Sequence, residues 1–238
     1  MENIVNDIKK IIDENITLVE INGEKYTNQS LRPVRNEDRV EKICFNDLAS
    51  IVKMIKNEGG IFKAPLYINI VSAEKVSVFT TTNEHKDREY PYCAESDAAK
   101  FRFGSYHNFE DFVIAMRSQF VQNEDSKEML AMLKKITNNN SVETEDDGIT
   151  QKITAQQGTS LSSAVKATPI RKLTPYRTFI EVEQPTSEFL FRVGDGSKFA
   201  LFEADGGAWK RKAKENISKY FEEQLKDEIE SGKVVLVG

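Results

Sequence analysis

The stretch LFEADGGAWKRKAKENISKYFEEQLK, residues Leu201–Lys226, decides how the C-terminal part of the chain folds. It opens with a short apolar run that is typical of a strand. Asp205 then precedes two glycines, where a carboxylate can accept hydrogen bonds from the free N–H groups of a helix start. Beyond it, apolar residues recur mostly at steps of four, which predicts a long amphipathic helix with one buried stripe. The stripe consists of Trp209, Ala213, Ile217, Tyr220, Phe221, Leu225 and Ile229.

This helix is expected to end at Gly232, which suits a left-handed C-terminal stop, and the apolar run 233–237 follows as a closing strand. A strand, a helix and a second strand of these lengths form a βαβ-like unit, although the sequence leaves open whether the two strands are parallel. With the other segments described below, the expected fold class is α+β (mixed α/β). We expect antiparallel-rich sheets, flanking helices and this C-terminal strand-helix-strand unit.

The Asp205–Gly207 turn has two interpretations. Free N–H groups at a helix start attract anions, and Lys210 and Arg211 in the first turn oppose the helix dipole unless an anion is bound. This pattern predicts an anion or ligand site. The alternative is a strand-to-helix turn with a solvated basic face, and the lack of a phosphate-binding glycine motif favours that alternative. Trp209 is better explained as a core residue than as a ligand-stacking one.

The composition is that of an ordinary globular protein of 238 residues, 39% hydrophobic and 30% charged, without an apolar run of membrane-spanning length. The net charge of −5 argues against a general nucleic-acid binder, while a local basic surface between residues 166 and 215 stays open. Cys44 and Cys93 are far apart in sequence and do not indicate a disulfide scaffold or a zinc site. We therefore expect reduced thiols in an intracellular protein, and the N-terminus shows no signal-peptide pattern.

Local signals place the other elements. Helices are expected where apolar residues recur at helical spacing: residues 3–14, a segment capped by Asn46 and ended by Gly59-Gly60, a segment capped by Asn108, and residues 126–136. Strands are expected at the alternating runs 17–21, 24–26, 39–45, 66–71, 76–81, 141–145, 149–155, 178–182 and 189–193. Asn22-Gly23 and Asp147-Gly148 suit hairpin turns. The resulting regions are a helix and hairpin at 1–30, an α+β region at 31–155, a loop or linker at 156–167 and a sheet and helix region at 168–238, which form one domain or two.

No catalytic or metal-binding constellation emerges. The only histidines, His85 and His107, lack ligand spacing, and His107 is expected at the surface beside a helix cap. The acidic run 143–148 lacks the acid that a calcium loop needs at its twelfth position. Glu181 and Glu203 lie near strands without the lysine that a nuclease site would add. We expect no catalytic residue, no metal and no cofactor.

Residues 174–193 read TPYRTFIEVEQPTSEFLFRV and are followed by ALFEADGGAWK, while FEDFVIAMRSQFVQ and DDGITQKITAQQG occur earlier. These phrases resemble the uncharacterised family of phage and prophage proteins that includes the YfdQ-like proteins, from about Leu31 to the C-terminus. The resemblance implies a phage accessory protein in the cytoplasm of a host bacterium, and it supplies no catalytic residues. The residues that match its phrases are Phe179, Glu181, Gln184, Pro185, Phe189, Arg192, Glu203, Asp205, Gly206, Gly207 and Trp209.

Polar residues among and beside these phrases are the hardest to explain by packing. They are Arg177, Glu181, Gln184 and Arg192. The two arginines therefore join Asp205, Gly206, Gly207, Lys210 and Arg211 as the candidate anion-binding or ligand-binding set.

Two functions compete. The first is a non-enzymatic protein that forms homo-oligomers and binds or sequesters a host protein, such as a defence component, or a nucleotide; many β segments with edges to cover motivate it. The second is a DNA-binding or nuclease-like factor of phage DNA metabolism, motivated by the basic segment 166–215. A virion or scaffolding role is a third reading. No membrane partner is expected.

Overall fold

The computed structural model describes the backbone of residues 18–21, 24–27, 40–62, 65–83, 86–137, 141–146, 151–156, 165–166, 170–194, 196 and 198–238. The chain divides into two compact units, Met1–Arg39 and Val40–Gly238. In the first unit, β1 (Leu18–Ile21) pairs antiparallel with β2 (Glu24–Thr27), which confirms the predicted hairpin strands. The predicted helix at 3–14 and the Asn22-Gly23 turn lie outside the described residues. The finer division of the chain into four regions stays a prediction.

The second unit contains a five-stranded mixed sheet with the order β13-β4-β5-β6-β3. Of its three central strands, β4 (Leu66–Ser72) and β6 (Tyr92–Glu95) both pair antiparallel with β5 (Lys75–Thr80). The alternation in 66–71 and 76–81 predicts the strands β4 and β5. The two outer strands are parallel to their neighbours: β3 (Ile43–Phe45) runs with β6, and β13 (Val234–Val237) runs with β4.

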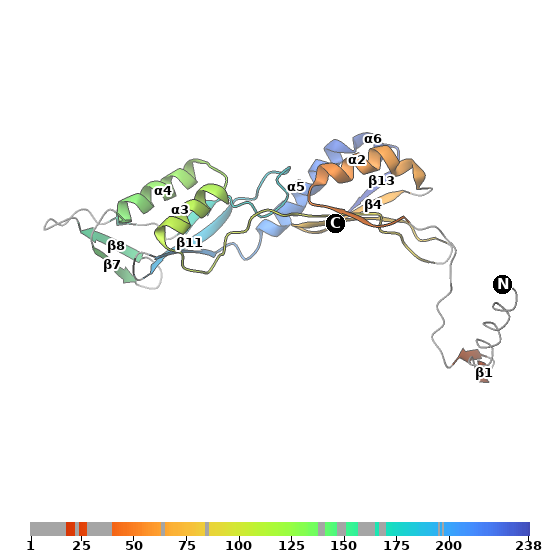
Figure 1. Ribbon diagram of the computed structural model, residues 1–238, viewed down its shortest axis with the longest axis horizontal. Coiled ribbons are helices and arrows are strands. Elements are labelled where there is room, and N and C mark those ends of the chain that lie inside the picture. The colour runs from red at the N-terminus through yellow and green to blue at the C-terminus, as the bar shows by residue number, and fades with distance from the viewer. Residues whose placement is uncertain are drawn as a thin grey trace, which may run out of the picture. The chain divides into compact units, whose positions relative to one another are not determined.

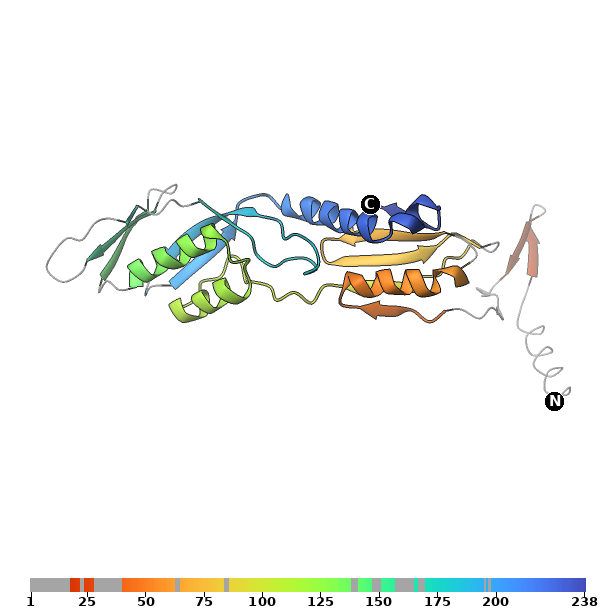
Figure 2. The ribbon, with the colours of Figure 1, turned by 90° about the horizontal axis from the view of Figure 1, so that it is seen from above.

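One face of this sheet is covered by helices. Figure 1 and Figure 2 show α2 (Leu48–Glu58), α5 (Trp209–Gln224) and α6 (Lys226–Glu230) on the same side of the strands. The helices and strands share one apolar core, because every second residue of a strand faces the helices. Its fully buried members include Leu48, Ile51, Ile68, Val76, Val78, Ala94, Ile217 and Phe221.

A second, antiparallel sheet has the order β10-β11-β12, formed by Ile170–Leu173, Ser187–Gly194 and Lys198–Glu203. In Figure 1, α3 (Phe109–Ser118) and α4 (Glu124–Thr137) cover one of its faces. Phenylalanines dominate the core between them, and the buried ones are Phe101, Phe112, Phe120, Phe189, Phe191 and Phe199. Two separate sheets with helices on one face confirm the predicted α+β class.

A third sheet joins β7 (Ser141–Asp146), β8 (Gln151–Gln156) and β9 (Val165–Lys166), all antiparallel. The first pair confirms the predicted strand at 141–145 and the part 151–155 of the predicted strand at 149–155, while residues 147–150, with the Asp147-Gly148 turn, lie outside the described residues. The short strand β9 falls inside the segment expected to be a loop.

The N-cap predicted for α3 is confirmed, whereas the N-cap predicted for α2 is wrong. Asn108 caps α3 as predicted, because its Oδ1 accepts from the N–H of Asp111 at 2.8 Å. Asn46 does not cap α2. Asp47 does, with its Oδ1 2.6 Å from the nitrogen of Ser50, while the Asn46 amide donates to Asp97. A carboxylate favours the positive end of the helix more strongly than an amide does.

The C-terminal strand-helix-strand segment is not a βαβ unit. The strand β12 belongs to the sheet β10-β11-β12, whereas β13 pairs with β4 in the five-stranded sheet. The sixteen residues of α5 span about 24 Å, so the helix carries the chain from one sheet to the other. The stripe is buried at Trp209, Ala213, Ile217, Phe221 and Leu225, and Tyr220 and Ile229 are partly buried. The prediction of a single helix to Gly232 is wrong, because α5 ends at Gln224 and the separate helix α6 follows; Gly232 adopts a positive φ of 74° after α6.

The predicted strand at 178–182 is also wrong, because these residues form a turn. Phe179 and Val182 are buried in the core of the five-stranded sheet, which explains their apolar spacing. Their backbone groups are bonded to a side chain instead of a neighbouring strand.

Candidate functional site

Arg177, the first cation of the candidate set, is enclosed by the fold. It is 4% exposed, and its guanidinium carbon lies 4.1 Å from the centroid of the Trp209 ring and 5.4 Å from that of Phe189. Its Nη1 donates to Glu203 at 2.8 Å, and its Nη2 donates to Ser187. Burial lowers the pKa of Arg177, and the neighbouring carboxylates act against that shift. The guanidinium therefore ties β11, the end of β12 and the start of α5 together.

Asp205 is not the N-cap of α5, which is Ala208. Its Oδ1 accepts from the N–H of Gly207 at 3.0 Å inside the preceding turn. Burial acts to raise the pKa of Asp205, but hydrogen bonds from Ser187 and Gly207 and the charge of Arg177 outweigh it, and the pKa lies below its usual value. The carboxylate thus sits where an external anion would have to bind.

The remaining members of the candidate set are dispersed. Gly206 and Gly207 have φ angles of 62° and 82°, so their role in the turn explains them as glycines. Lys210 and Arg211 are exposed on α5, and Arg211 Nε lies 3.1 Å from a carboxylate oxygen of Glu215.

Arg192 lies on β11 with the opposite orientation to Phe191 and Val193, which face the helices of that sheet. The structure therefore brings Arg177 and Asp205 together and leaves Arg192 apart. An anion site at the turn stays a prediction.

Two other polar residues of the 174–193 phrase, Gln184 and Glu181, form hydrogen bonds with backbone groups. Gln184 is 6% exposed; its Oε1 accepts from the N–H groups of Arg177 and Thr178, and its Nε2 donates to the carbonyls of Phe179 and Val182. Its side chain thus supplies the partners that a neighbouring strand would supply.

Glu181 acts on a distant helix. Its Oε1 accepts from the N–H of Leu48 at 2.7 Å and that of Ala49 at 3.4 Å, at the first turn of α2. Together with Asp47 it satisfies free N–H groups of that helix start and lies at the positive end of its dipole.

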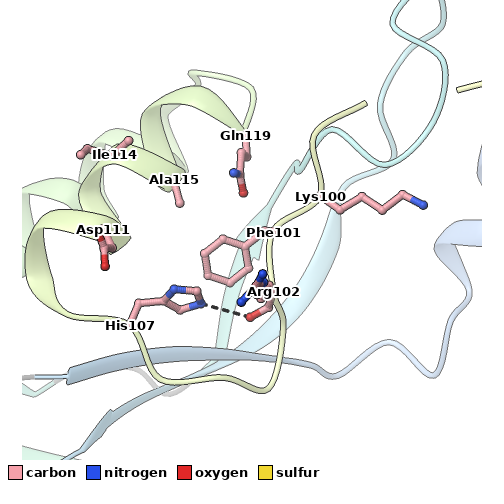
Figure 3. A pocket seen from close by; sticks show the side chains of 8 residues that line it. All are labelled: Lys100, Phe101, Arg102, His107, Asp111, Ile114, Ala115 and Gln119. Atoms are coloured by element: carbon pink, nitrogen blue, oxygen red, sulfur yellow. Dashed lines mark hydrogen bonds between the residues drawn. The ribbon is translucent and has the colours of Figure 1, made fainter. Parts of the chain in front are cut away.

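A pocket of about 270 Å³ opens beside α3 (Figure 3). Its lining residues are Lys100, Phe101, Arg102, His107, Asp111, Ile114, Ala115 and Gln119. His107, expected at the surface, is half-buried; its ring lies 4.9 Å from that of Phe101, and its Nε2 is 3.2 Å from the carbonyl oxygen of Arg102. Lys100 is paired with Glu74 at 2.6 Å. Across the described residues, no cluster of three or more His, Cys, Asp or Glu side chains could hold a metal ion.

A further surface feature is the face of the five-stranded sheet opposite α2 and α5, which we call the open face. Strand alternation assigns to it Cys44, Tyr67, Asn69, Ser77, Phe79, Cys93, Val235 and Val237, and Val71 adjoins it at the register shift between Ile70 and Ser72. Three of its valines are substantially exposed, Val71 at 48%, Val235 at 36% and Val237 at 39%. Within the described part of this unit, the covering helices lie on the other face (Figure 1).

Aromatic rings cross the open face in a row. The rings of Tyr67 and Phe79 are cross-strand neighbours and stack with centroids 5.4 Å apart and 6° between their planes. Tyr90, which is 49% exposed, lies 5.8 Å from Phe79, and the Arg88 guanidinium carbon is 5.0 Å above the same ring. The sequence contained a signal for this face, because the predicted strands 66–71 and 76–81 carry apolar residues on both of their faces.

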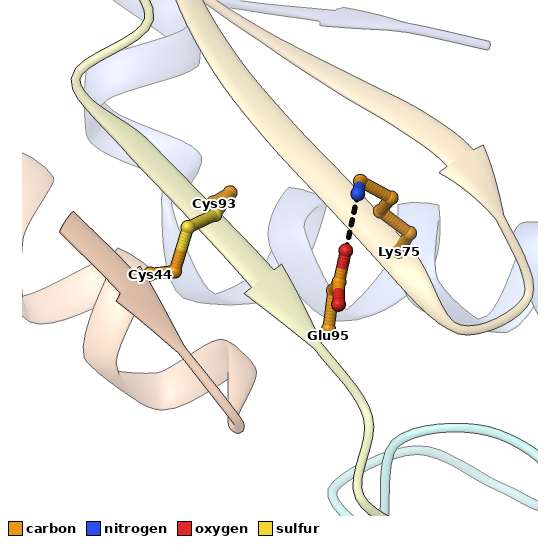
Figure 4. Close-up of a disulfide and its surroundings, with 4 residues drawn as sticks. All are labelled: Cys44, Lys75, Cys93 and Glu95. Atoms are coloured by element: carbon orange, nitrogen blue, oxygen red, sulfur yellow. Dashed lines mark hydrogen bonds and ion pairs between the residues drawn. A yellow bond between two sulfur atoms is a disulfide. The ribbon is translucent and has the colours of Figure 1, made fainter. Parts of the chain in front are cut away.

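The two cysteines form a disulfide on the same face, contrary to the expected reduced thiols (Figure 4). Cys44 of β3 lies directly opposite Cys93 of β6 in the parallel register, with Cα atoms 4.6 Å apart. The sequence separation of 49 residues concealed this pairing, because strand register is a property of the folded chain. Beside it, Lys75 pairs with Glu95 across β5 and β6 (Figure 4).

Comparison with protein-family models, with curated proteins and with solved structures gives no match. The resemblance to the phage and prophage family therefore stays an expectation. Among the described residues, no helix is both long enough and apolar enough to span a membrane.

Proposed function

We propose that this protein acts by binding and not by catalysis, and that it assembles with further copies of itself through the open face. The observation that carries the proposal is the exposed apolar and aromatic surface of that face, which includes Val71, Tyr90, Val235 and Val237. Exposed apolar patches of this kind mark interaction sites in globular proteins. In keeping with the phrases of the 174–193 region, we propose a phage accessory role in the host cytoplasm, with a host protein or a nucleotide as the target.

The size of the face fits a second copy. Strands lie about 4.8 Å apart, so five strands are about 24 Å wide, and the seven residues of β4 extend for about 24 Å. The strands β13, β4, β5, β6 and β3 contain 4, 7, 6, 4 and 3 residues, so the flat area is about 380 Å², and a pair of copies covers about 760 Å². Side-chain relief raises the accessible area above this value, toward the size of weak interfaces, which bury less than about 1,200 Å² in total. Two sheets that pack face to face stand about 10 Å apart, which lets such side chains interdigitate.

The charge of the face also favours a protein surface over a polyanion. Lys75 is paired with Glu95, and Arg88 lies over the Phe79 ring, where its guanidinium also donates to the carbonyl of Thr80. Nucleic-acid surfaces instead carry several cations that release counterions from phosphate. Because Lys75 and Glu95 balance each other, two copies of this face can meet under twofold symmetry without a net like-charge repulsion from this pair.

Sedimentation velocity from about 1 to about 100 μM tests the proposal, because interfaces of this size associate over a wide range that includes micromolar constants. Wild type should show a concentration-dependent dimer or larger species. Val71→Glu should shift it to monomer, because a carboxylate would be buried without a partner. Ile114→Glu is the matched control, since Ile114 is 56% exposed on α3, away from the open face. A wild-type protein that stays monomeric throughout contradicts self-assembly.

The alternative of a DNA-binding factor makes a separate prediction. Arg177 is enclosed and Arg211 lies beside Glu215, so neither is an unpaired surface cation. DNA binding that weakens steeply with salt and disappears when Lys210 and Arg211 are replaced by glutamine would favour that alternative.

A further inference from the structure

The two halves of the disulfide differ in accessibility. Cys93 is 2% exposed on β6, which has β5 on one side and β3 on the other. Cys44 is an exposed residue on β3, the outermost strand of the sheet. We therefore expect a thiol from solution to approach Cys44 more readily than Cys93.

We propose that Cys44 is a thiol–disulfide exchange site for low-molecular-weight thiols of the glutathione class, with Cys93 as the buried partner that closes the disulfide again. The site requires only the register of β3 and β6 and the unequal exposure of the two residues, but it lies on the open face, so assembly through that face would cover Cys44. Exposure and access decide which sulfur of a disulfide is attacked.

The chemistry balances with the thiol as the only co-reactant. An incoming thiolate attacks Sγ of Cys44, the Sγ–Sγ bond breaks, and its electron pair leaves on Sγ of Cys93, which then takes up a proton. The product carries a mixed disulfide on Cys44. A second thiolate attacks the sulfur of the external thiol in that mixed disulfide and releases Cys44 as a thiolate. Overall, two external thiols are oxidised to one external disulfide and the protein disulfide is reduced to two thiols.

Exchange also breaks the covalent bond that joins β3 to β6. The strand β3 has three residues, Ile43–Phe45, and pairs with β6 alone among the described strands. A glutathione group on Cys44 would stand on the edge of the sheet, whereas the same group on Cys93, which is 2% exposed between β5 and β3, would have to displace neighbouring side chains. The fold thus permits modification at one sulfur of the pair.

The test uses the full-length wild-type protein, so it does not depend on whether a variant folds. The protein is equilibrated in buffers of reduced and oxidised glutathione at several ratios, quenched in acid, blocked with N-ethylmaleimide and mapped by peptide mass spectrometry. We expect glutathione on Cys44 and at least about tenfold less on Cys93. In the native, fully reduced protein, alkylation of Cys44 should also be at least about tenfold faster than that of Cys93.

Denatured protein supplies the control, because both cysteines are then accessible and should react at similar rates. Glutathione found equally on both cysteines of the native protein would overturn the proposal, and so would glutathione found mainly on Cys93. Failure to recover the Cys44–Cys93 peptide in the oxidising buffers would overturn it as well. The reactions are run at the lowest protein concentration of the sedimentation series, where a partner copy covers Cys44 least. Self-assembly is read from oligomer size, so failure of the exchange proposal is distinguishable from failure of self-assembly.

Discussion

Replacement of Gln184 by methionine should destabilise the protein strongly. The change keeps the length of the side chain and removes its polar atoms. The N–H groups of Arg177 and Thr178 would then lose their acceptor at 3.0 and 3.3 Å, and both residues are buried, at 4% and 0% exposure, so water cannot take its place. Each unsatisfied buried group costs about 1–3 kcal/mol. The carbonyls of Phe179 and Val182 would lose a donor too, so the expected loss is about 3–5 kcal/mol.

Urea unfolding followed by the fluorescence of Trp209, the single tryptophan, measures this loss. Gln122→Met is the matched control. The Gln122 amide also donates to backbone carbonyls, of Met116 and Phe120, but the residue is exposed, and among the described residues no backbone N–H is shown bonded to it. We expect the control to lose less than about 1 kcal/mol. A Gln184→Met variant that loses no more than the control would refute the view that Gln184 organises the 178–182 turn, and a ligand role would regain support.

Three further predictions concern other parts of the fold. Glu181→Ala should lower the free energy of unfolding by about 1 kcal/mol, because the N–H groups of Leu48 and Ala49 lose the carboxylate that caps them, and Glu181→Gln should lower it less. Urea titration compares the two variants with wild type, and equal stability of all three proteins would contradict the capping role. Under oxidising conditions, Cys44→Ser should cost about 4 kcal/mol, the loop-closure value for a separation of 49 residues, while in excess reductant wild type and variant should unfold alike. Burial and the Glu58 carboxylate raise the pKa of Tyr92 to about 12, so the folded protein favours the neutral phenol. The stability that neutral Tyr92 contributes is fully present below pH 10 and is lost as the pH rises through about 12. Absorbance titration should show one tyrosine ionising last and missing in Tyr92→Phe, and ionisation of every tyrosine near pH 10 would contradict this.

Sequence patterns correctly predicted those helices, caps and hairpins that depend on residues close together in the chain. The stripe of α5 from Trp209 is buried as its spacing requires, and Asn108 caps α3 because the cap involves residues three apart. The hairpin strands β4 and β5 also followed from alternation and a short connection.

Non-local interactions decided the rest. The strand β13 pairs with β4, which lies far earlier in the chain, so no local signal could show that α5 connects two sheets. The turn at 178–182 alternates like a strand, yet the side chain of Gln184 bonds its backbone. Cys44 and Cys93 meet because β3 and β6 are neighbours, which the sequence does not state.

The candidate site shows the same division. Sequence reasoning singled out Arg177 because a cation among apolar residues is hard to assign to packing. The structure encloses it against Trp209 and bonds it to Glu203, so its charge serves the junction of β12 and α5. The open face was missed because apolar residues on both sides of a strand also fit a strand buried on both faces.

Hydroxyl-radical footprinting across protein concentrations tests self-assembly through the open face most directly. Tyr90 on the open face and Tyr106 elsewhere are matched probes, 49% and 50% exposed. From about 1 to about 100 μM the modification of Tyr90 should fall by more than about twofold, as expected when an exposed ring enters an interface, while that of Tyr106 stays constant. Constant modification of Tyr90 throughout, or protection of Tyr106 instead, would contradict assembly through this face.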